Sequence, residues 1–240
     1  MRRPNDGTER GTIVDYHLIR SRRKTLALKV IEDGSLEARA PLDTPVSEID
    51  RFIRKKSAWI QTRQKAQLQK MQFRVTDHMW LRLLGVSIPV LAVPDGIFAL
   101  RRAVNPRDNL VTVPTGCDEA TLKRGIVGVY RTFAEEVIRQ RVAWFEMVIG
   151  NHPVQVRING ASTRWGSCSS KGRLNFSWKL IMADGEAIDA VVIHELCHLS
   201  HMNHSQAFWE MVHRYCPDYA HQKKKLTQLS EKLASEDWKG

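Results

Sequence analysis

The sequence predicts an α+β protein in which a β-rich front portion, residues 12–115, precedes a mostly helical back portion, residues 116–240. The front portion contains short, partly alternating apolar segments separated by turns with Gly and Pro, a pattern typical of strands. The back portion contains one long segment of helical periodicity and several shorter ones. Residues 1–11 are polar and charged, so we expect a disordered leader there.

The front portion is expected to begin with a hairpin. Residues 12–20 and 25–31 have the composition of strands. Glu32–Ser35, with the sequence "EDGS", is a turn signal, and the apolar segment that starts at Leu36 is the expected return strand.

An amphipathic helix is expected over residues 48–70, with Ser47 as its cap. Apolar residues recur there at helical spacing, at Ile49, Phe52, Ile53, Trp59 and Ile60. The opposite face of this helix is basic. Residues 80–113 are expected to form short strands, because turn residues interrupt them at Gly85, Pro89, Pro94, Gly96 and Pro106.

The back portion is expected to start with a long helix. Asp118 can cap it, apolar residues follow at helical spacing, and Gly150 stops it near residue 149. The other elements expected are strands at 154–158 and 173–180 and helices at roughly 185–201, 205–215 and 218–235.

Composition narrows the class of protein. The net charge is +11, with basic clusters within 20–24, 51–56 and 223–225. These clusters are either solvated faces or a surface that attracts nucleic acid, nucleotides or other phosphorylated ligands, and charge alone does not separate the two.

The four cysteines form no C-x-x-C pair, which argues against a zinc ribbon or a disulfide framework. Without a membrane-spanning stretch or a signal-peptide pattern, we expect a cytoplasmic protein with no membrane partner. The oligomeric state is left open.

The most informative segment is His194-Glu195-Leu196-Cys197-His198, an H-E-x-x-H pattern in an apolar helical stretch. Residues four apart stand one turn apart on the same helix face. Both imidazoles can therefore bind one zinc ion at about 2.0–2.1 Å. Glu195 lies beside the first ligand and can take a proton from water acidified by the metal, so the pattern predicts it as the general base.

A third ligand is expected at His204, six residues past His198. Asn203 precedes it, and Asn tolerates the left-handed conformation that ends helices, so the chain can turn back to the same metal. Three protein ligands and an open position are typical of catalytic zinc sites. Two alternatives stay open. His201 can replace His204 as a ligand, and Cys197 is a soft donor that is otherwise a small buried helix residue.

Two long segments, "RWGSCSSKGRLNFSWKL" and "VVIHELCHLSHMNHSQAFWEMV", resemble the YgjP-like metal-dependent hydrolases, also called YgjP-like metallopeptidases. The segments "IRSRRKTLALKV", "DGSLEARAP" and "RFIRKKSAWI" are similar to that family's N-terminal portion, so the resemblance covers roughly residues 12–215. It implies a zincin-like C-terminal core, related to the WLM and SprT-like peptidases, in which the H-E-x-x-H helix packs on a small sheet. It also implies that one Zn²⁺ is held by His194, His198 and His204.

The second signature of that family is Arg164-Trp165-Gly166-Ser167-Cys168. Gly166 would allow close backbone approach. Arg164 can bind an oxyanion or a phosphate, or it can pair structurally with a carboxylate while Trp165 fills the core. Zincin cores lay an extended peptide along an edge strand, which this segment or "RLNFSW" can supply. The substrate-binding residues expected are therefore Arg164, Trp165, Ser167 and Arg173.

These residues favour a zinc-dependent metallopeptidase acting on a peptide or protein substrate. Its oxyanion donor is unassigned among His213, Tyr215 and Tyr219. One alternative is a metal-dependent nucleotide phosphohydrolase of the nucleoside triphosphate pyrophosphatase type. Its phosphate contacts would be Arg164, Lys171, Arg173 and the Arg22-Arg23-Lys24 cluster, although three histidines favour zinc over Mg²⁺ or Mn²⁺. The other alternative is a nucleic-acid-associated protease that docks through its basic front portion.

Overall fold

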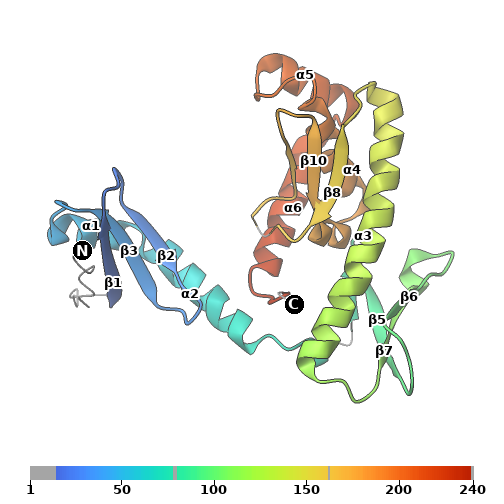
Figure 1. Cartoon of the computed structure of the whole chain (residues 1–240), viewed down its shortest axis with the longest axis horizontal. Helices are drawn as coiled ribbons and strands as arrows, with labels where there is room; N and C mark the ends of the chain where they lie inside the picture. The colour runs from blue at the N-terminus through green and yellow to red at the C-terminus, as the bar shows by residue number, and fades with distance from the viewer. Residues whose placement is uncertain (1–14, 78–79, 162, 239–240) are drawn as a thin grey trace. The chain divides into compact units, whose positions relative to one another are not determined.

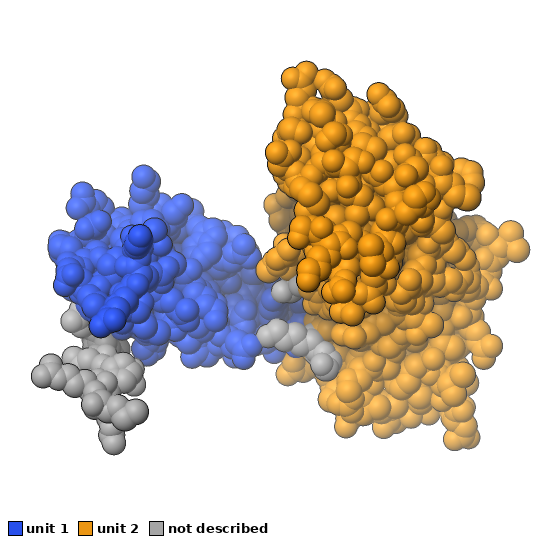
Figure 2. All heavy atoms as spheres, turned by 45° about the horizontal axis from the view of Figure 1, so that its top comes forward, with its two compact units in different colours: residues 1–73, 232–237 blue, residues 74–231, 238–240 orange. Residues whose placement is uncertain are grey.

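The computed structural model describes residues 15–77, 80–161 and 163–238. It divides into two compact units, shown in Figure 1 and coloured separately in Figure 2: residues 1–73 with 232–237, and residues 74–231 with 238–240. The expected leader, residues 1–11, lies outside the described residues. The compact units separate between Phe73 and Arg74, and the functional division expected at residue 115 stays a prediction.

Unit 1 combines a small sheet with two helices. Its strands are β1 (Tyr16–Ser21), β2 (Ala27–Val30) and β3 (Leu36–Pro41), and its helices are α1 (Val46–Lys55) and α2 (Ser57–Gln72). The strand order is β1-β3-β2. β2 and β3 form the antiparallel hairpin that the sequence predicted, and β1 pairs with β3 in parallel.

The single helix expected over residues 48–70 is wrong, because the chain leaves the helical conformation at Lys56 (φ −105°, ψ 10°). Ser47 is not the cap either; Pro45 occupies that position without a side-chain hydrogen bond. Of the expected apolar face, Ile49, Ile53 and Ile60 are buried in the core of unit 1, whereas Phe52 is half-buried and Trp59 is exposed. Ile53 and Ile60 lie on either side of the break and are seven residues apart, which is also the spacing of one face of a continuous helix. Apolar periodicity therefore does not reveal the break.

Unit 2 begins with a four-stranded sheet of order β4-β5-β7-β6. The strands are β4 (Trp80–Leu83), β5 (Val86–Val93), β6 (Ala99–Arg101) and β7 (Leu110–Pro114). They agree with the short strands expected over residues 80–113. β5 and β7 are parallel, whereas the outer pairs are antiparallel.

Helix α3 (Glu119–Ile149) connects the two sheets of unit 2. It begins as predicted, because the Asp118 side chain accepts a hydrogen bond from the backbone N–H of Thr121. It ends at Gly150, which is left-handed (φ 80°) as a helix-terminating glycine should be. α3 contacts β7 of the first sheet and β8 of the second (Figure 1), so it is the scaffold on which the rest of the unit is arranged.

The second sheet has the order β8-β10-β9, with β8 (Gln155–Asn159), β9 (Gly166–Cys168) and β10 (Arg173–Ser177). β10 is parallel to β8 and antiparallel to β9, which makes β9 an edge strand. The strand expected over 173–180 is too long, because residues Trp178–Met182 form a short 3₁₀ helix instead. Burial of Trp178 and Leu180 explains why the apolar pattern continued past the end of the strand.

Three helices complete unit 2: α4 (Gly185–Cys197), α5 (Gln206–Tyr215) and α6 (Tyr219–Leu233), whose last two residues are assigned to unit 1. Side chains cap the first two, because Asp184 accepts from the N–H of Ala187 and Ser205 accepts from that of Phe208. α4 contacts α3, α5 and β9. It ends four residues earlier than expected. Among the described residues, no helix has the length and apolar character to cross a membrane.

Candidate metal centre

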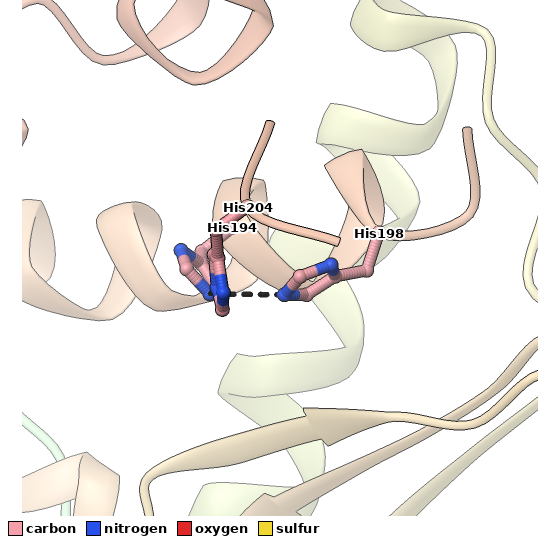
Figure 3. A group of neighbouring side chains, drawn as sticks. All are labelled: His194, His198 and His204. Carbon is pink, nitrogen blue, oxygen red and sulfur yellow. Dashed lines mark hydrogen bonds between the residues drawn. The ribbon is translucent and has the colours of Figure 1, made fainter. Parts of the chain in front are cut away.

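Three histidine side chains, His194, His198 and His204, converge where α4 ends, and we call them the histidine triad (Figure 3). Nε2 of His194 lies 3.2 Å from Nε2 of His198 and 3.3 Å from Nε2 of His204. Two nitrogens bound to one tetrahedral zinc ion at about 2.0–2.1 Å would stand about 3.3–3.4 Å apart. The spacing of these nitrogens therefore suits a single metal ion.

The outer nitrogens of two triad rings are held by hydrogen bonds. Nδ1 of His198 lies 3.0 Å from the carbonyl oxygen of His201. A carbonyl only accepts, so Nδ1 carries the proton and Nε2 of His198 is left bare for a metal. Nδ1 of His194 lies 2.9 Å from the hydroxyl of Tyr219 on α6. In metal sites such bonds fix both the tautomer and the ring orientation of the ligand.

Aromatic rings from α5 and α6 enclose the triad. Phe208 packs against all three imidazoles, Trp209 stacks on His204 at 5.4 Å, and Tyr219 stacks on His194 at 5.5 Å. Burial, reinforced by the two neighbouring imidazoles, lowers the pKa of His194 to about 3. The ring of His194 is therefore neutral at physiological pH, which is the form that binds a metal.

The last turn of α4 is tied to the loop that follows α3. The side-chain amide of Asn151 donates to the carbonyl of Leu196 (2.9 Å), and the hydroxyl of Ser200 donates to Oδ1 of Asn151 (2.9 Å). Asn151 directly follows Gly150, the residue at which α3 ends. Its second partner lies 49 residues away along the chain, and no local sequence signal indicates such a bond.

The carboxyl group of Glu195 is buried, with 6% of the residue exposed. Burial raises its pKa to about 7, although the positive charge of Arg164 and a hydrogen bond from the backbone of Cys168 oppose the shift. A β-carbon added to Gly166 would lie 2.6 Å from Oε1 of Glu195, so the carboxyl group lies directly against strand β9. A carboxyl group with a pKa near neutrality can both accept and release a proton at physiological pH.

The four residues expected to bind substrate are not equally close to this carboxyl group. Arg164 is exposed, lies two residues before the start of β9, and its charge acts on Glu195. The carbonyl of Trp165 accepts a backbone hydrogen bond from β10 (2.8 Å), which is a structural role. Ser167 lies in β9, and Arg173 is exposed at the start of β10. Within the described residues, no hydrogen bond or ion pair joins either of these two side chains to the triad or to Glu195.

The sequence also suggests His201 as a metal ligand and three side chains as oxyanion donors, and these residues differ in their contacts with the triad. The side chain of His201 is outside the group of metal-binding atoms found among the described residues, and its carbonyl serves His198 instead. Of His213, Tyr215 and Tyr219, Tyr219 is the one hydrogen-bonded to the triad. The contact between Gly166 and Glu195 could not be predicted from sequence, which indicates only that a glycine permits close approach.

Convergent imidazoles beside a buried carboxyl group are typical of the active sites of metal-dependent hydrolases. Residues 24–229 match the family model described as YgjP-like, metallopeptidase domain, and this match includes the triad and Glu195. The chain therefore belongs to the YgjP-like metallopeptidase domain family and is a metal-dependent hydrolase, as the sequence resemblance implied.

The solved structures similar to part of the chain include two metallopeptidase zymogens. One is the metallopeptidase zymogen of Pyrococcus abyssi abylysin, 23% identical, with a TM-score of 0.36 over 41% of this chain and 97% of that one. The other is the metallopeptidase zymogen of Methanocaldococcus jannaschii jannalysin, 20% identical, with a TM-score of 0.35 over 38% of this chain and 94% of that one. A search of curated proteins gives no match.

Proposed function

We propose that this chain is a zinc peptidase of the zincin type, in which the histidine triad holds one Zn²⁺ and Glu195 is the general base. The observation that carries the proposal is the spacing of the triad nitrogens, 3.2 and 3.3 Å, beside the buried carboxyl group. An imidazole-only donor set favours zinc or another transition metal over Mg²⁺ or Ca²⁺, which prefer oxygen ligands.

Zinc bound at three imidazoles supplies Lewis-acid chemistry, since it acidifies water and polarises a carbonyl group. The carboxylate of Glu195 takes the proton of the attacking water and delivers it to the leaving amine. Tyr219 and the carbonyl of His201 keep two imidazoles in the orientation that presents Nε2. The surrounding aromatic rings exclude water from one side of the triad.

The edge strand β9 supports a peptide as the substrate. In the order β8-β10-β9, one side of β9 has no strand partner among the described residues. Unpaired backbone groups at such an edge can bind an extended peptide by strand addition. A peptide added there would pass Gly166, against which Glu195 lies. Arg164, two residues before β9, would then bind a substrate carboxylate or a developing oxyanion at the same edge.

A second candidate, a nucleotide phosphohydrolase, is favoured by one observation. Arg164 is exposed and its positive charge acts on Glu195, and an arginine in that position suits a phosphate group. We rank this function second because phosphate hydrolysis usually relies on Mg²⁺ held by carboxylates, whereas the donors of the triad are imidazoles.

The test compares purified wild type with Glu195→Gln at equal, measured zinc content, against casein and a panel of nucleoside triphosphates in parallel. Glu186→Gln is the matched control, because Glu186 is exposed in the first turn of the same helix. Cleavage of casein that is lost only in Glu195→Gln supports the peptidase. Release of phosphate or pyrophosphate that depends on Glu195, without proteolysis, identifies the phosphohydrolase. Full proteolytic activity of Glu195→Gln would reject Glu195 as the base.

A further inference from the structure

Positive charge is concentrated in the N-terminal segment of unit 1. Residues 15–73 contain thirteen Lys and Arg against seven Asp and Glu, a net charge of +6 within the total of +11. Residues 74–240, nearly three times as many, contribute +4. The peptidase chemistry proposed above lies wholly in unit 2 and does not use this charge.

A small cavity of about 230 Å³ lies between β2 and the junction of the two helices of unit 1. Leu28 of β2, Phe52 of α1, Lys56 at the helix break and Trp59 of α2 line it, and we call it the Trp59 pocket. Its volume is below the roughly 300–1,000 Å³ of pockets that hold drug-sized ligands. A pocket of this size with two aromatic walls suits one planar ring.

The cations around the Trp59 pocket are available to a ligand. The guanidinium of Arg63 lies over the Trp59 ring, 5.8 Å from its centroid. Lys55 and Lys56 are exposed, and in the described part of the chain neither makes an ion pair. Trp59 itself is 39% exposed. Exposed aromatic rings interleaved with unpaired cations are typical of proteins that stack bases and bind the phosphates between them.

We propose that unit 1 binds single-stranded nucleic acid, with one base stacked on Trp59 in the pocket and the adjacent phosphates on Lys55, Lys56 and Arg63. The base must be unpaired, because a ring inside a duplex cannot enter a pocket of this kind. The observations apply equally to RNA and to DNA, since the stacking surface and the cations recognise features that both share.

An anionic membrane is the other partner that a basic helix could suit, and the burial pattern argues against it. Membrane-surface helices insert their apolar face into the lipid. The apolar face of α1 is already used, because Ile49 is 0% and Ile53 is 4% exposed within the core of unit 1. The aromatic residues that remain accessible line a concave pocket, which favours a ring over a bilayer.

The test measures fluorescence anisotropy of labelled oligo(U) and oligo(dT) of about ten nucleotides with the full chain, over about 50–200 mM salt. Trp59→Ala should weaken binding by about 5- to 150-fold, the effect of losing one stacked base, and leave the salt dependence unchanged. Trp59→Phe should retain most of the affinity. Lys56→Gln should reduce the slope of log affinity against log salt by about 0.7, as expected for one lost phosphate contact. Lys224→Gln, the same change at an exposed residue of unit 2, is the matched control.

Preference for oligo(U) assigns RNA, preference for oligo(dT) assigns DNA, and equal affinity assigns both; each supports the proposal. It is overturned if neither oligonucleotide binds, or if the corresponding duplex binds equally well. Equal losses in Lys56→Gln and Lys224→Gln would also overturn it, because affinity would then follow net charge rather than this pocket. Binding to vesicles containing phosphatidylserine, without oligonucleotide binding, would assign the surface to a membrane. If Trp59→Ala does not fold, as judged by circular dichroism, Lys56→Gln carries the test.

Discussion

The carboxyl group of Glu195 and the α-carbon of Gly166 are in direct contact, so that a β-carbon at Gly166 would fall 2.6 Å from Oε1 and 2.7 Å from Cγ of Glu195. This contact links the edge strand β9 to α4, which carries His194 and ends at His198. It is the point at which a substrate on β9 and the proposed general base would meet.

Gly166→Ala is expected to abolish most activity while preserving zinc binding. The added methyl group must displace the Glu195 carboxylate, and misplacement of a reacting group by about 1 Å can cost about 100-fold in rate. Zinc content and casein hydrolysis of the same preparation provide the measurement. Gly160→Ala is the control, because a β-carbon there would meet its nearest neighbour, the Arg131 side chain, at 3.4 Å. Normal activity in Gly166→Ala would show that Glu195 need not occupy its observed position.

Tyr219→Phe is expected to weaken zinc binding by about 10- to 100-fold, the usual effect of removing a hydrogen bond to the outer nitrogen of a histidine ligand. The ring that stacks on His194 is retained, and only the bond to Nδ1 (2.9 Å) is lost. Competition with a chromophoric chelator measures the affinity. Tyr215→Phe removes a hydroxyl from the neighbouring helix and should have no effect. Equal zinc affinity in both variants would mean that the hydroxyl of Tyr219 does not orient His194.

The elements that sequence predicted well are those with local chemical signals at both ends. Asp118 and Gly150 delimit α3 because a cap and a left-handed glycine act within a few residues of the helix. The H-E-x-x-H spacing placed two imidazoles together for the same reason, since a single helix turn determines their separation. His204 was expected near them, six residues past His198, but the left-handed turn expected at Asn203 is wrong, because in the described part of the chain the non-glycine residues with positive φ are Leu84 and Asp95.

The features that sequence did not predict depend on contacts between distant residues. The break at Lys56 has no Gly or Pro to mark it. Tyr219 reaches His194 from α6, 25 residues along the chain. From sequence, Tyr219 is only one of three candidate oxyanion donors, because the sequence does not indicate which atom its hydroxyl contacts. The Trp59 pocket was not predicted for the same reason, since Leu28 and Trp59 meet only when β2 packs against α2.

The pH dependence of stability should include a contribution from the cap of α3. The backbone N–H of Thr121 donates to Asp118, and this bond lowers the pKa of Asp118 below its ordinary value of 3.8. A carboxyl group whose pKa is lower in the folded state stabilises the fold above its unfolded pKa and loses that effect as pH falls through the folded value. The stabilisation by Asp118 is therefore complete at pH 7 and declines below about pH 4.

Asp118→Asn isolates this contribution, because Asn retains the cap acceptor but does not titrate. The difference in urea midpoint between wild type and Asp118→Asn should be constant from neutral pH to about pH 5 and shrink below about pH 4. Asp43→Asn, which removes an exposed carboxylate outside any helix, is the control. A difference that stays constant down to pH 3 would contradict the role of the Asp118 charge.

His204→Ala is expected to remove zinc binding without unfolding unit 2. His204 is exposed, and it packs against the rings of Phe208 and Trp209, contacts worth about 0.5–1.5 kcal/mol each. In chelator, wild type and His204→Ala should therefore melt within a few degrees of each other. Added zinc should stabilise wild type by about 4 kcal/mol at 1,000 times its Kd, and leave His204→Ala unchanged.

His201→Ala should respond to zinc as wild type does, because the backbone carbonyl that holds His198 is retained. The reverse pattern, with zinc stabilising His204→Ala but not His201→Ala, would make His201 the third ligand. That result would require a different turn after α4, in which the side chain of His201 and not that of His204 pointed toward His194 and His198.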